Sequence, residues 1–256
     1  MRGQKLSIIV ITKNAANKIK NCLESVKWAD EIIVVDGGSA DGTIEIVKKY
    51  TDKIITSEFD GFDKERNKGT EEASGDWILQ MDADEVVPED FKKRLLRLLE
   101  GEDEGCVSFK FRRRNIFLGR LMMRGGWYHY SAHLFKKGFA HYKGGIHEQL
   151  IVNGKQGKME AGLEHYPFYS ISEFIERQNR YTTLQANEMF AKNRDISKKE
   201  IMYNLKVKPI KLFWKMYIKK KGYKEKLHGF IFSVLFSWVH FVKWLKYWEL
   251  RPDNKS

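Results

Sequence analysis

The chain has 256 residues, 42% of them hydrophobic, and carries a formal net charge of +12. This length allows one large domain or a domain with an appendage, and the presence of only four prolines argues against extensive disorder. Cys22 and Cys106 are the only cysteines and form no CxxC pair, which argues against a disulfide framework and favours a reducing, cytoplasmic setting. The first apolar run, residues 6–11, is too short for the core of a signal peptide.

The positive charge is concentrated in the last quarter of the chain. Residues 192–256 carry 17 Lys and Arg against five Asp and Glu, an excess as large as the net charge of the whole chain. Such a segment predicts a polyanionic partner of its own, either a membrane surface or a nucleic acid. We therefore expect a main domain over 1–190 and a basic, aromatic-rich helical extension over 191–256.

Strand-like and helix-like segments alternate through the first hundred residues. Strands are expected at 6–11, 31–36, 53–56 and 76–82, and helices at 17–28, 41–50, 63–73 and 88–101. Asp41 is the expected N-cap of the second helix. Alternation of this kind predicts an α/β fold with a mostly parallel central sheet and helices on both faces. Such sheets bind ligands at the carboxyl ends of their strands.

The second half of the chain is less regular in its pattern. Residues 106–117 alternate like a strand, and residues 118–165 are rich in glycine and aromatic side chains, which predicts loops mixed with short strands. A helix is expected over 170–190, because Ser170 and Glu173 have the spacing of a capping box.

Polar side chains follow three of the expected strands. They are Thr12 and Asn14 after the first strand, Asp36 after the second, and Asp82 and Asp84, followed by Glu85, after the last. Each group alone could be a helix cap, a turn or a solvated loop. Together, at one sheet edge, they predict a site in which a carboxylate binds ribose or base and a D-x-D holds Mg²⁺ or Mn²⁺ against a diphosphate. The metal would also offset the repulsion among the neighbouring carboxylates.

Several segments resemble a known enzyme family. The segments "SIIVITKN", "ADEIIVVDGGSADGT", "ERNKGTEEASGDWILQMDADE" and "GGIHEQL" resemble those of family 2 glycosyltransferases with the GT-A fold. Within that family the chain is similar to the lipopolysaccharide core β-1,4-glucosyltransferase-like subgroup. The resemblance covers roughly residues 5–190 and is strongest through residue 85.

The resemblance implies an inverting, metal-dependent transfer of a hexose from a nucleotide-sugar donor, usually UDP-linked, to a lipid-linked or cell-envelope glycan. It implies that Thr12 and Asp36 bind the nucleoside and that Arg66 lies near the base or the phosphates; Asn14 and Asp82 are expected beside them. The metal, Mn²⁺ or Mg²⁺, is expected at Asp82 and Asp84, with Asp84 as the direct ligand and His165 completing the shell.

Inversion requires a base that deprotonates the acceptor, and Glu148 in "GGIHEQL" is the candidate. The alternatives are that Glu148 is a loop carboxylate paired with a nearby Lys or Arg, and that Asp84 or Glu85 is the base. His147 is placed to orient Glu148 or merely to pack. His133 stands where the family usually has the arginine of an Arg-Leu-Phe segment, which puts the acceptor's identity in doubt.

Residues 208–250 mix lysines with Phe, Trp and Tyr. The least charged run, Gly229 to Val242, has 14 residues, whereas a bilayer span needs about 20. The sequence therefore predicts helices that lie in the headgroup region of an anionic membrane, with the protein peripheral to its inner face. The alternative is a helical pair that packs its aromatic side chains internally.

Two other classes of function fit the sequence less well. Basic charge interleaved with aromatic residues is typical of nucleic-acid-binding proteins, but here the charge lies outside the carboxylate-lined crevice, so no nucleic-acid partner is expected. A dinucleotide oxidoreductase would carry G-x-G-x-x-G after the first strand, where this chain reads "TKNAAN".

Overall fold

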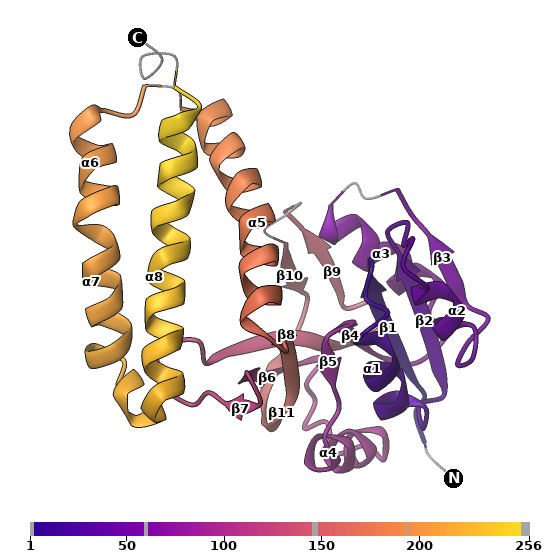
Figure 1. Ribbon diagram of the computed structural model, residues 1–256. Coiled ribbons are helices and arrows are strands. Elements are labelled where there is room, and N and C mark those ends of the chain that lie inside the picture. The colour runs from indigo at the N-terminus through magenta and orange to yellow at the C-terminus, as the bar shows by residue number, and fades with distance from the viewer. Residues whose placement is uncertain (1–2, 59–60, 145–147, 194, 252–256) are drawn as a thin grey trace. The chain divides into compact units, whose positions relative to one another are not determined.

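The computed structural model describes residues 3–58, 61–144, 148–193 and 195–251 (Figure 1). It divides into two compact units, one of Met1–Arg114 with His129–Tyr166 and one of Asn115–Tyr128 with Pro167–Ser256. The division differs from the boundary expected at residue 190, because the helix that ends near that residue belongs with the C-terminal helices. Each unit is described by itself.

The first unit is built on a sheet whose N-terminal half is parallel. Its strands are β1 (Leu6–Thr12), β2 (Glu31–Asp36), β3 (Ile54–Thr56) and β4 (Trp77–Asp82), in the order β3-β2-β1-β4. The register pairs Thr12 with Asp36 and Ile11 with Asp82. The carboxyl ends of β1, β2 and β4 therefore meet at one edge, as the sequence predicts.

Antiparallel strands extend this sheet beyond β4. They are β5 (Glu85–Val86), β6 (Ser108–Phe117), β8 (His129–Lys136) and β11 (Gln156–Phe168), with the short β7 (Arg120–Leu121) beside β6. Strand β8 pairs with β4, and β5 pairs with β11. Strands β9 (Ala140–Lys143) and β10 (Gln149–Val152) form a separate antiparallel pair. These short strands account for the irregular pattern of residues 118–165.

Helices cover both faces of the parallel half. The helices are α1 (Ile19–Val26), α2 (Thr43–Val47), α3 (Phe62–Glu72) and α4 (Glu89–Leu99). Helices α1 and α4 bury their apolar side chains against alternate residues of β1 such as Ile8, while Phe62 of α3 packs near Ile9 on the opposite face. The predicted α/β class with helices on both faces is confirmed. The N-cap of α2 is Gly42 rather than Asp41, whose carboxylate instead accepts a hydrogen bond from the Thr43 hydroxyl.

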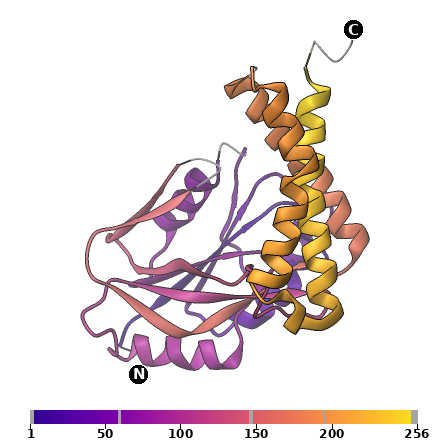
Figure 2. The ribbon, with the colours of Figure 1, turned by 90° about the vertical axis from the view of Figure 1, so that its left-hand side faces the viewer.

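The second unit is a helical bundle. It contains α5 (Ile171–Lys192), α6 (Lys198–Lys206), α7 (Lys208–Trp214), a π-helical turn (Lys215–Lys219), a 3₁₀ turn (Gly222–Glu225) and α8 (Lys226–Glu249). Helix α8 packs against α5, α6 and α7, and both views show these helices side by side (Figures 1 and 2). Ser170 accepts a hydrogen bond from the Glu173 amide and caps α5, as predicted.

Aromatic side chains form the core of the bundle. Phe174 of α5 and Phe232 of α8 are buried with Phe117, Met122 and Phe168. The expected alternative, in which the aromatic residues of the tail pack internally, is therefore realised for part of the tail. Many other apolar side chains of α7 and α8 remain exposed.

Helix α8 also corrects the sequence argument about membrane crossing. Among the described residues, one helix, Gly222–Glu249, is long and apolar enough to cross a membrane by length and composition. The uncharged run has only 14 residues, but the helix continues beyond it through Lys243 and Lys246. Only 28% of its most apolar window is buried within the protein.

Candidate functional site

The loops that follow β1 and β2 are tied together at the sheet edge. The carboxylate of Asp36 accepts hydrogen bonds from the amides of Gly38 and Ser39, at 3.0 and 2.8 Å, and from the Ser39 hydroxyl. Asn14 has a positive φ of 51°, and its side-chain oxygen accepts a hydrogen bond from the amide of Ala40. Asn14 therefore shapes the loop.

Beside the ends of β1 and β2, two buried polar atoms have no hydrogen-bond partner within the described part of the chain. One is the hydroxyl oxygen of Thr12 and the other is Oε1 of Glu65, a residue of α3 whose exposed fraction is 3%. Burial raises the pKa of Glu65, partly opposed by Lys68 and Lys13. The added Cβ of an alanine at position 37 would lie 3.3 Å from Glu65 Oε1, which places this carboxylate against the chain that follows Asp36.

Asp82 is held by two arginines. Its Oδ1 accepts a hydrogen bond from Arg66 Nη2 at 2.7 Å and its Oδ2 accepts one from Arg113 Nη2 at 2.7 Å. Burial raises the pKa of Asp82, but the two guanidinium groups outweigh it and hold that pKa well below its usual range. The repulsion among the carboxylates is therefore offset by arginine, not only by a metal as the sequence argument supposed.

Glu85 is part of the same network. Arg113 Nε lies 2.8 Å from Glu85 Oε1, and Glu85 Oε2 accepts a hydrogen bond from the amide of Asp82 at 2.9 Å. Burial raises the pKa of Glu85, and Arg113 opposes that effect. With both oxygens engaged in the turn, Glu85 holds the backbone of the D-x-D segment in place.

Asp84 and His165 face each other across the short β5–β11 ladder. The backbone of the pair is fixed because the Tyr166 amide donates to the Asp84 carbonyl at 2.8 Å. His165 Nε2 lies 3.4 Å from Asp84 Oδ1, and both side chains are about nine-tenths buried. Burial lowers the pKa of His165, with Asp84 opposing it, and the neutral imidazole that results is the form that binds metals.

The pair fits a hard or borderline divalent cation, since it offers a carboxylate oxygen and an imidazole nitrogen. In the described part of the chain no group of three or more His, Cys, Asp or Glu side chains is close enough to hold a metal ion. A cation at Asp84 and His165 would therefore take its remaining ligands from the donor phosphates and water.

Glu148 joins the site through Arg66. Its Oε1 lies 3.3 Å from Arg66 Nε, so a single buried guanidinium contacts both Glu148 and Asp82. The pairing of Glu148 with an arginine, one of the alternatives from the sequence, is thus present. The side chain of Glu148 remains 18% exposed. The side chain of Arg66 is only 4% exposed, so a direct contact between Arg66 and a nucleotide would require neighbouring side chains to move.

The site thus contains side chains that the sequence argument did not identify. Arg113 lies in a run of three arginines, where nothing marks one member as special, and Glu65 directly precedes Arg66 in a polar segment. His133, in place of the family arginine, shares a hydrogen bond between its Nδ1 and the Tyr142 hydroxyl at 2.6 Å. His147 lies outside the described residues.

The chain is similar to known proteins along most of its length. The model of "Glycosyl transferase family 2" matches residues 7–151. The lipopolysaccharide core biosynthesis glycosyltransferase LpsC of Rhizobium meliloti is 27% identical over 88% of this chain and 85% of its own. An uncharacterized glycosyltransferase of Rickettsia conorii is 23% identical over 99% of this chain and 93% of its own. A structure of S. aureus TarS 1–349 in complex with UDP-GlcNAc has a TM-score of 0.48 and 14% identity, over 98% of this chain and 91% of that one.

The family match and the similarity to LpsC confirm the enzyme class expected from the sequence. Because the family model matches more than half of its residues, the chain belongs to glycosyl transferase family 2.

Proposed function

We propose that this glycosyltransferase transfers a hexose, with inversion, from a UDP-linked donor to a cell-envelope glycan. The observation that carries the proposal is the placement of Thr12, Asp36 and Asp82 at one sheet edge, with Glu148 joined to Asp82 through Arg66. The similarity to LpsC, named for lipopolysaccharide core biosynthesis, supports the choice of acceptor.

The nucleoside would bind at the ends of β1 and β2. There the unpartnered Thr12 hydroxyl and Glu65 Oε1 offer hydrogen-bond capacity, and buried polar atoms of this kind are costly unless a partner satisfies them. A ribose hydroxyl or a base N–H supplies the donor that Glu65 lacks. Asp36 and Asn14 would keep the loop in shape around the ligand.

Asp84 and His165 would hold a divalent cation, which when bound neutralises charge on the donor diphosphate. Asp82 is better placed to orient Arg66 and Arg113 than to bind the cation, because each of its oxygens already accepts a hydrogen bond from an arginine. The metal role expected for Asp82 is therefore not part of this proposal.

Glu148 would accept the proton of the attacking acceptor hydroxyl. Inversion by direct displacement needs one carboxylate on the side of the attacking group. Glu148 lines a cavity and is joined to Asp82 of the D-x-D segment through Arg66. Arg66 fixes the orientation of that carboxylate. Glu85 is a poorer base, because both of its oxygens are engaged within the turn.

Two variants separate the metal site from the base. We expect Asp84→Asn to lose the increase in UDP affinity that Mn²⁺ produces, measured by calorimetry with and without the metal. We expect Glu148→Gln to keep that increase and to lose transfer, measured as UDP released from UDP-sugars with lipopolysaccharide core glycan as acceptor. Loss of a positioned base typically lowers the rate by about 10²–10⁴-fold.

The control is Glu72→Gln, which removes an exposed carboxylate at the end of α3 and should change neither property. Turnover of the Glu148 variant at nearly the wild-type rate would place the base elsewhere. Unchanged Mn²⁺ dependence in the Asp84 variant would overturn the metal assignment.

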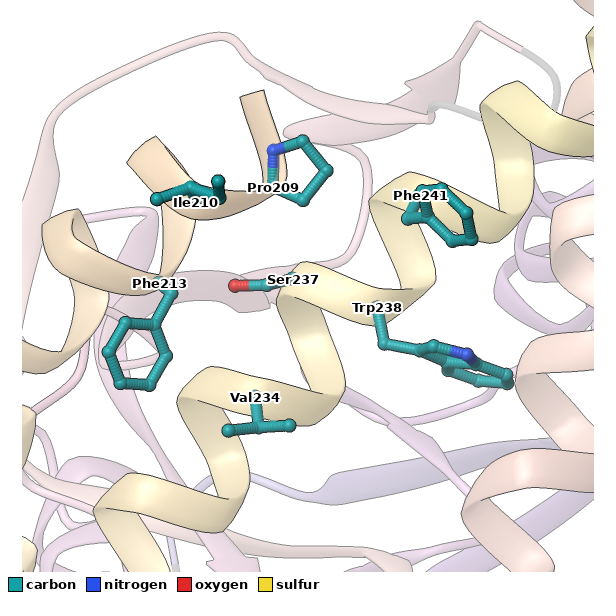
Figure 3. A pocket seen from close by; sticks show the side chains of 7 residues that line it. All are labelled: Pro209, Ile210, Phe213, Val234, Ser237, Trp238 and Phe241. Carbon is teal, nitrogen blue, oxygen red and sulfur yellow. The ribbon is translucent and has the colours of Figure 1, made fainter. Parts of the chain in front are cut away.

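We propose in addition that the bundle docks on an anionic membrane through α7 and α8. A cavity of about 340 Å³ between these helices is lined by apolar side chains, including Ile210, Phe213, Val234 and Trp238 (Figure 3). Ile210 and Trp214 are 60% and 55% exposed. Lysines at 208, 211, 215, 219, 220 and 221 belong to α7 and the segment that follows it. Apolar and basic side chains in such proximity suit the headgroup region of an anionic bilayer.

A further inference from the structure

A second cavity, beside Glu148, lies apart from the proposed nucleoside site. It measures about 520 Å³ and is lined by side chains of the first unit, among them Lys110, Tyr130, His133, Tyr142, Glu148 and Gln156. Its walls come from β6, β8, β9, β10 and β11, away from the ends of β1 and β2 where the nucleoside is proposed to bind. Its position next to the proposed base makes it the place for the acceptor.

The walls of this cavity are fixed by hydrogen bonds to neighbouring elements. Asn67 of α3 donates to the Tyr142 carbonyl and accepts from the Tyr142 amide, both at 2.9 Å. The Tyr142 hydroxyl in turn is hydrogen-bonded to His133. The aromatic wall is therefore preorganised, which lowers the entropic cost of binding a ligand against it.

Cationic side chains surround the exposed ring of Tyr130. The Arg112 guanidinium carbon and Lys158 Nζ each lie 5.7 Å from the centre of that ring, and Arg112 Nε donates to the Tyr130 hydroxyl at 3.2 Å. Lys110, two residues before Arg112 on β6, lines the cavity itself. Tyr130 is 46% exposed, so its ring is available to a ligand.

We propose that this cavity binds an acceptor sugar that bears an anionic group, a carboxylate or a phosphate. The sugar ring would lie on Tyr130, and its anion would be held by Lys110, Arg112 and Lys158. Hydrogen bonds between such cations and oxyanions are about twice as strong as neutral ones, and Arg offers a two-pronged contact. The proposal rests on the proposed function, because it takes Glu148 as the base that receives the proton of the same sugar.

The test compares three soluble sugars: methyl glucoside, methyl glucuronide and methyl glucoside 6-phosphate. Their affinities are measured by ligand-observed NMR titration of the full chain with UDP and Mn²⁺ present, at low and at high salt. We expect at least one anionic sugar to bind about 10-fold more tightly than the neutral one, and we expect salt to reduce this preference. Which of the two anions is preferred identifies the source of the negative charge.

Variants connect that preference to the named side chains. The double variant Arg112→Gln with Lys158→Gln should lose the roughly 10-fold preference while its UDP affinity and melting temperature stay at wild-type values. Tyr130→Ala should weaken the binding of all three sugars, whereas Tyr130→Phe, which keeps the ring, should bind them with wild-type affinity. Lys93→Gln, which removes an exposed lysine of α4, is the matched control.

Equal affinity for the three sugars, or a preference that survives in the double variant, would overturn the inference. If none of the three sugars binds while UDP still does, the inference is also overturned, but the proposed donor site is unaffected. Failure of the proposed function has a different signature, since UDP would then not bind while the sugar preference is unaffected.

Discussion

Two positive charges compensate Asp82, because its carboxylate accepts hydrogen bonds from Arg66 and from Arg113. Removing one partner of a buried ion pair leaves the other charge without compensation, which typically costs about 3–5 kcal/mol of stability. An exposed ion pair contributes little, since water already solvates both groups. The network is therefore expected to matter for folding as well as for catalysis.

Arg113→Gln should lower the free energy of unfolding by about 3 kcal/mol, chiefly because it takes the guanidinium from Glu85, whose side chain is 3% exposed; the loss at Asp82 adds less, since that side chain is 31% exposed. The adjacent Arg114→Gln is the control, since its partner Asp90 is half exposed, and it should cost less than about 1 kcal/mol. Urea denaturation of the two variants measures the difference. Equal losses would show that the buried network has no special role in stability.

For single residues, the sequence identifies site residues that directly follow a strand end. It misses residues whose place in the site depends on strand register or on helix packing. Thr12, Asp36 and Asp82 lie at one edge because parallel strands end together. Arg113 could not be singled out, because a register irregularity between Phe109 and Phe111 changes which residues of β6 share a face. Glu65 is hidden for a similar reason, since its burial depends on how α3 packs against β2.

Among the elements, α8 depends on two glycines that allow the backbone to approach closely. A Cβ placed on Gly229 would lie 1.9 Å from the carbonyl oxygen of Gly222, and a Cβ on Gly222 would lie 2.8 Å from that of Met216. These neighbours are backbone atoms, which cannot move aside as the end of a flexible side chain can. The turn between the π-helical segment and α8 therefore requires glycine at both positions.

Gly229→Ala should lower the free energy of unfolding by about 1–3 kcal/mol through this overlap. The direction of this change in the free energy of unfolding is informative, because Gly→Ala in an unobstructed helix raises stability by about 1 kcal/mol. Val234→Ala, on an exposed position of the same helix, is the comparison and should have a smaller effect. Thermal unfolding of both variants gives the result. A stabilised Gly229 variant would mean that the backbone at Gly222 relaxes without cost.

Element prediction from the sequence is good where contacts are local and poor where they are distant. The capping box of Ser170 and Glu173 marks the start of α5, because that interaction is local. The partner of α5 is α8, more than thirty residues further along, so no local pattern assigns α5 to the C-terminal unit. The uncharged run within α8 is much shorter than the helix itself, because lysines near a helix end do not end the helix.

For the whole molecule, the distribution of charge and of exposed apolar surface points to the bundle as the part that meets another surface. The exposed apolar residues of α7 and α8 include Ile210, Trp214, Phe230 and Val234. In water such exposure is unfavourable, and apolar surface beyond a few hundred Å² is typical of interaction sites. Each basic residue near an anionic bilayer contributes about 1 kcal/mol, so the lysines of α7 and the apolar face would act together.

Truncation of the chain is not a suitable test of membrane docking by the bundle. Removing the residues after 195 would take α8 away from α5 and expose Phe174 and Ala186, so loss of binding in such a fragment would not separate docking from unfolding. The full chain with changes confined to exposed side chains is the better material. Ile210 and Trp214 are suitable because more than half of each side chain is exposed.

Full-length protein should co-sediment with vesicles of anionic phosphatidylglycerol more than with neutral phosphatidylcholine vesicles, and the difference should shrink as salt rises, because screening acts over about 8 Å at physiological ionic strength. The pair Ile210→Ser and Trp214→Ser should weaken binding to anionic vesicles several-fold at an unchanged melting temperature, whereas Ile151→Ser, an exposed apolar residue of β10, should leave it unchanged.

Three outcomes of this experiment decide between arrangements of the bundle. Release of the vesicle-bound protein by alkaline carbonate is expected for helices that lie in the headgroup region, and retention would instead mean that Gly222–Glu249 crosses the bilayer. If the protein binds anionic and neutral vesicles equally, and binds RNA with a steep salt dependence, then the partner of this surface is a nucleic acid and not a membrane. Since the lysines alone could serve either polyanion, the loss caused by Ile210→Ser and Trp214→Ser is the result that assigns the surface to lipid.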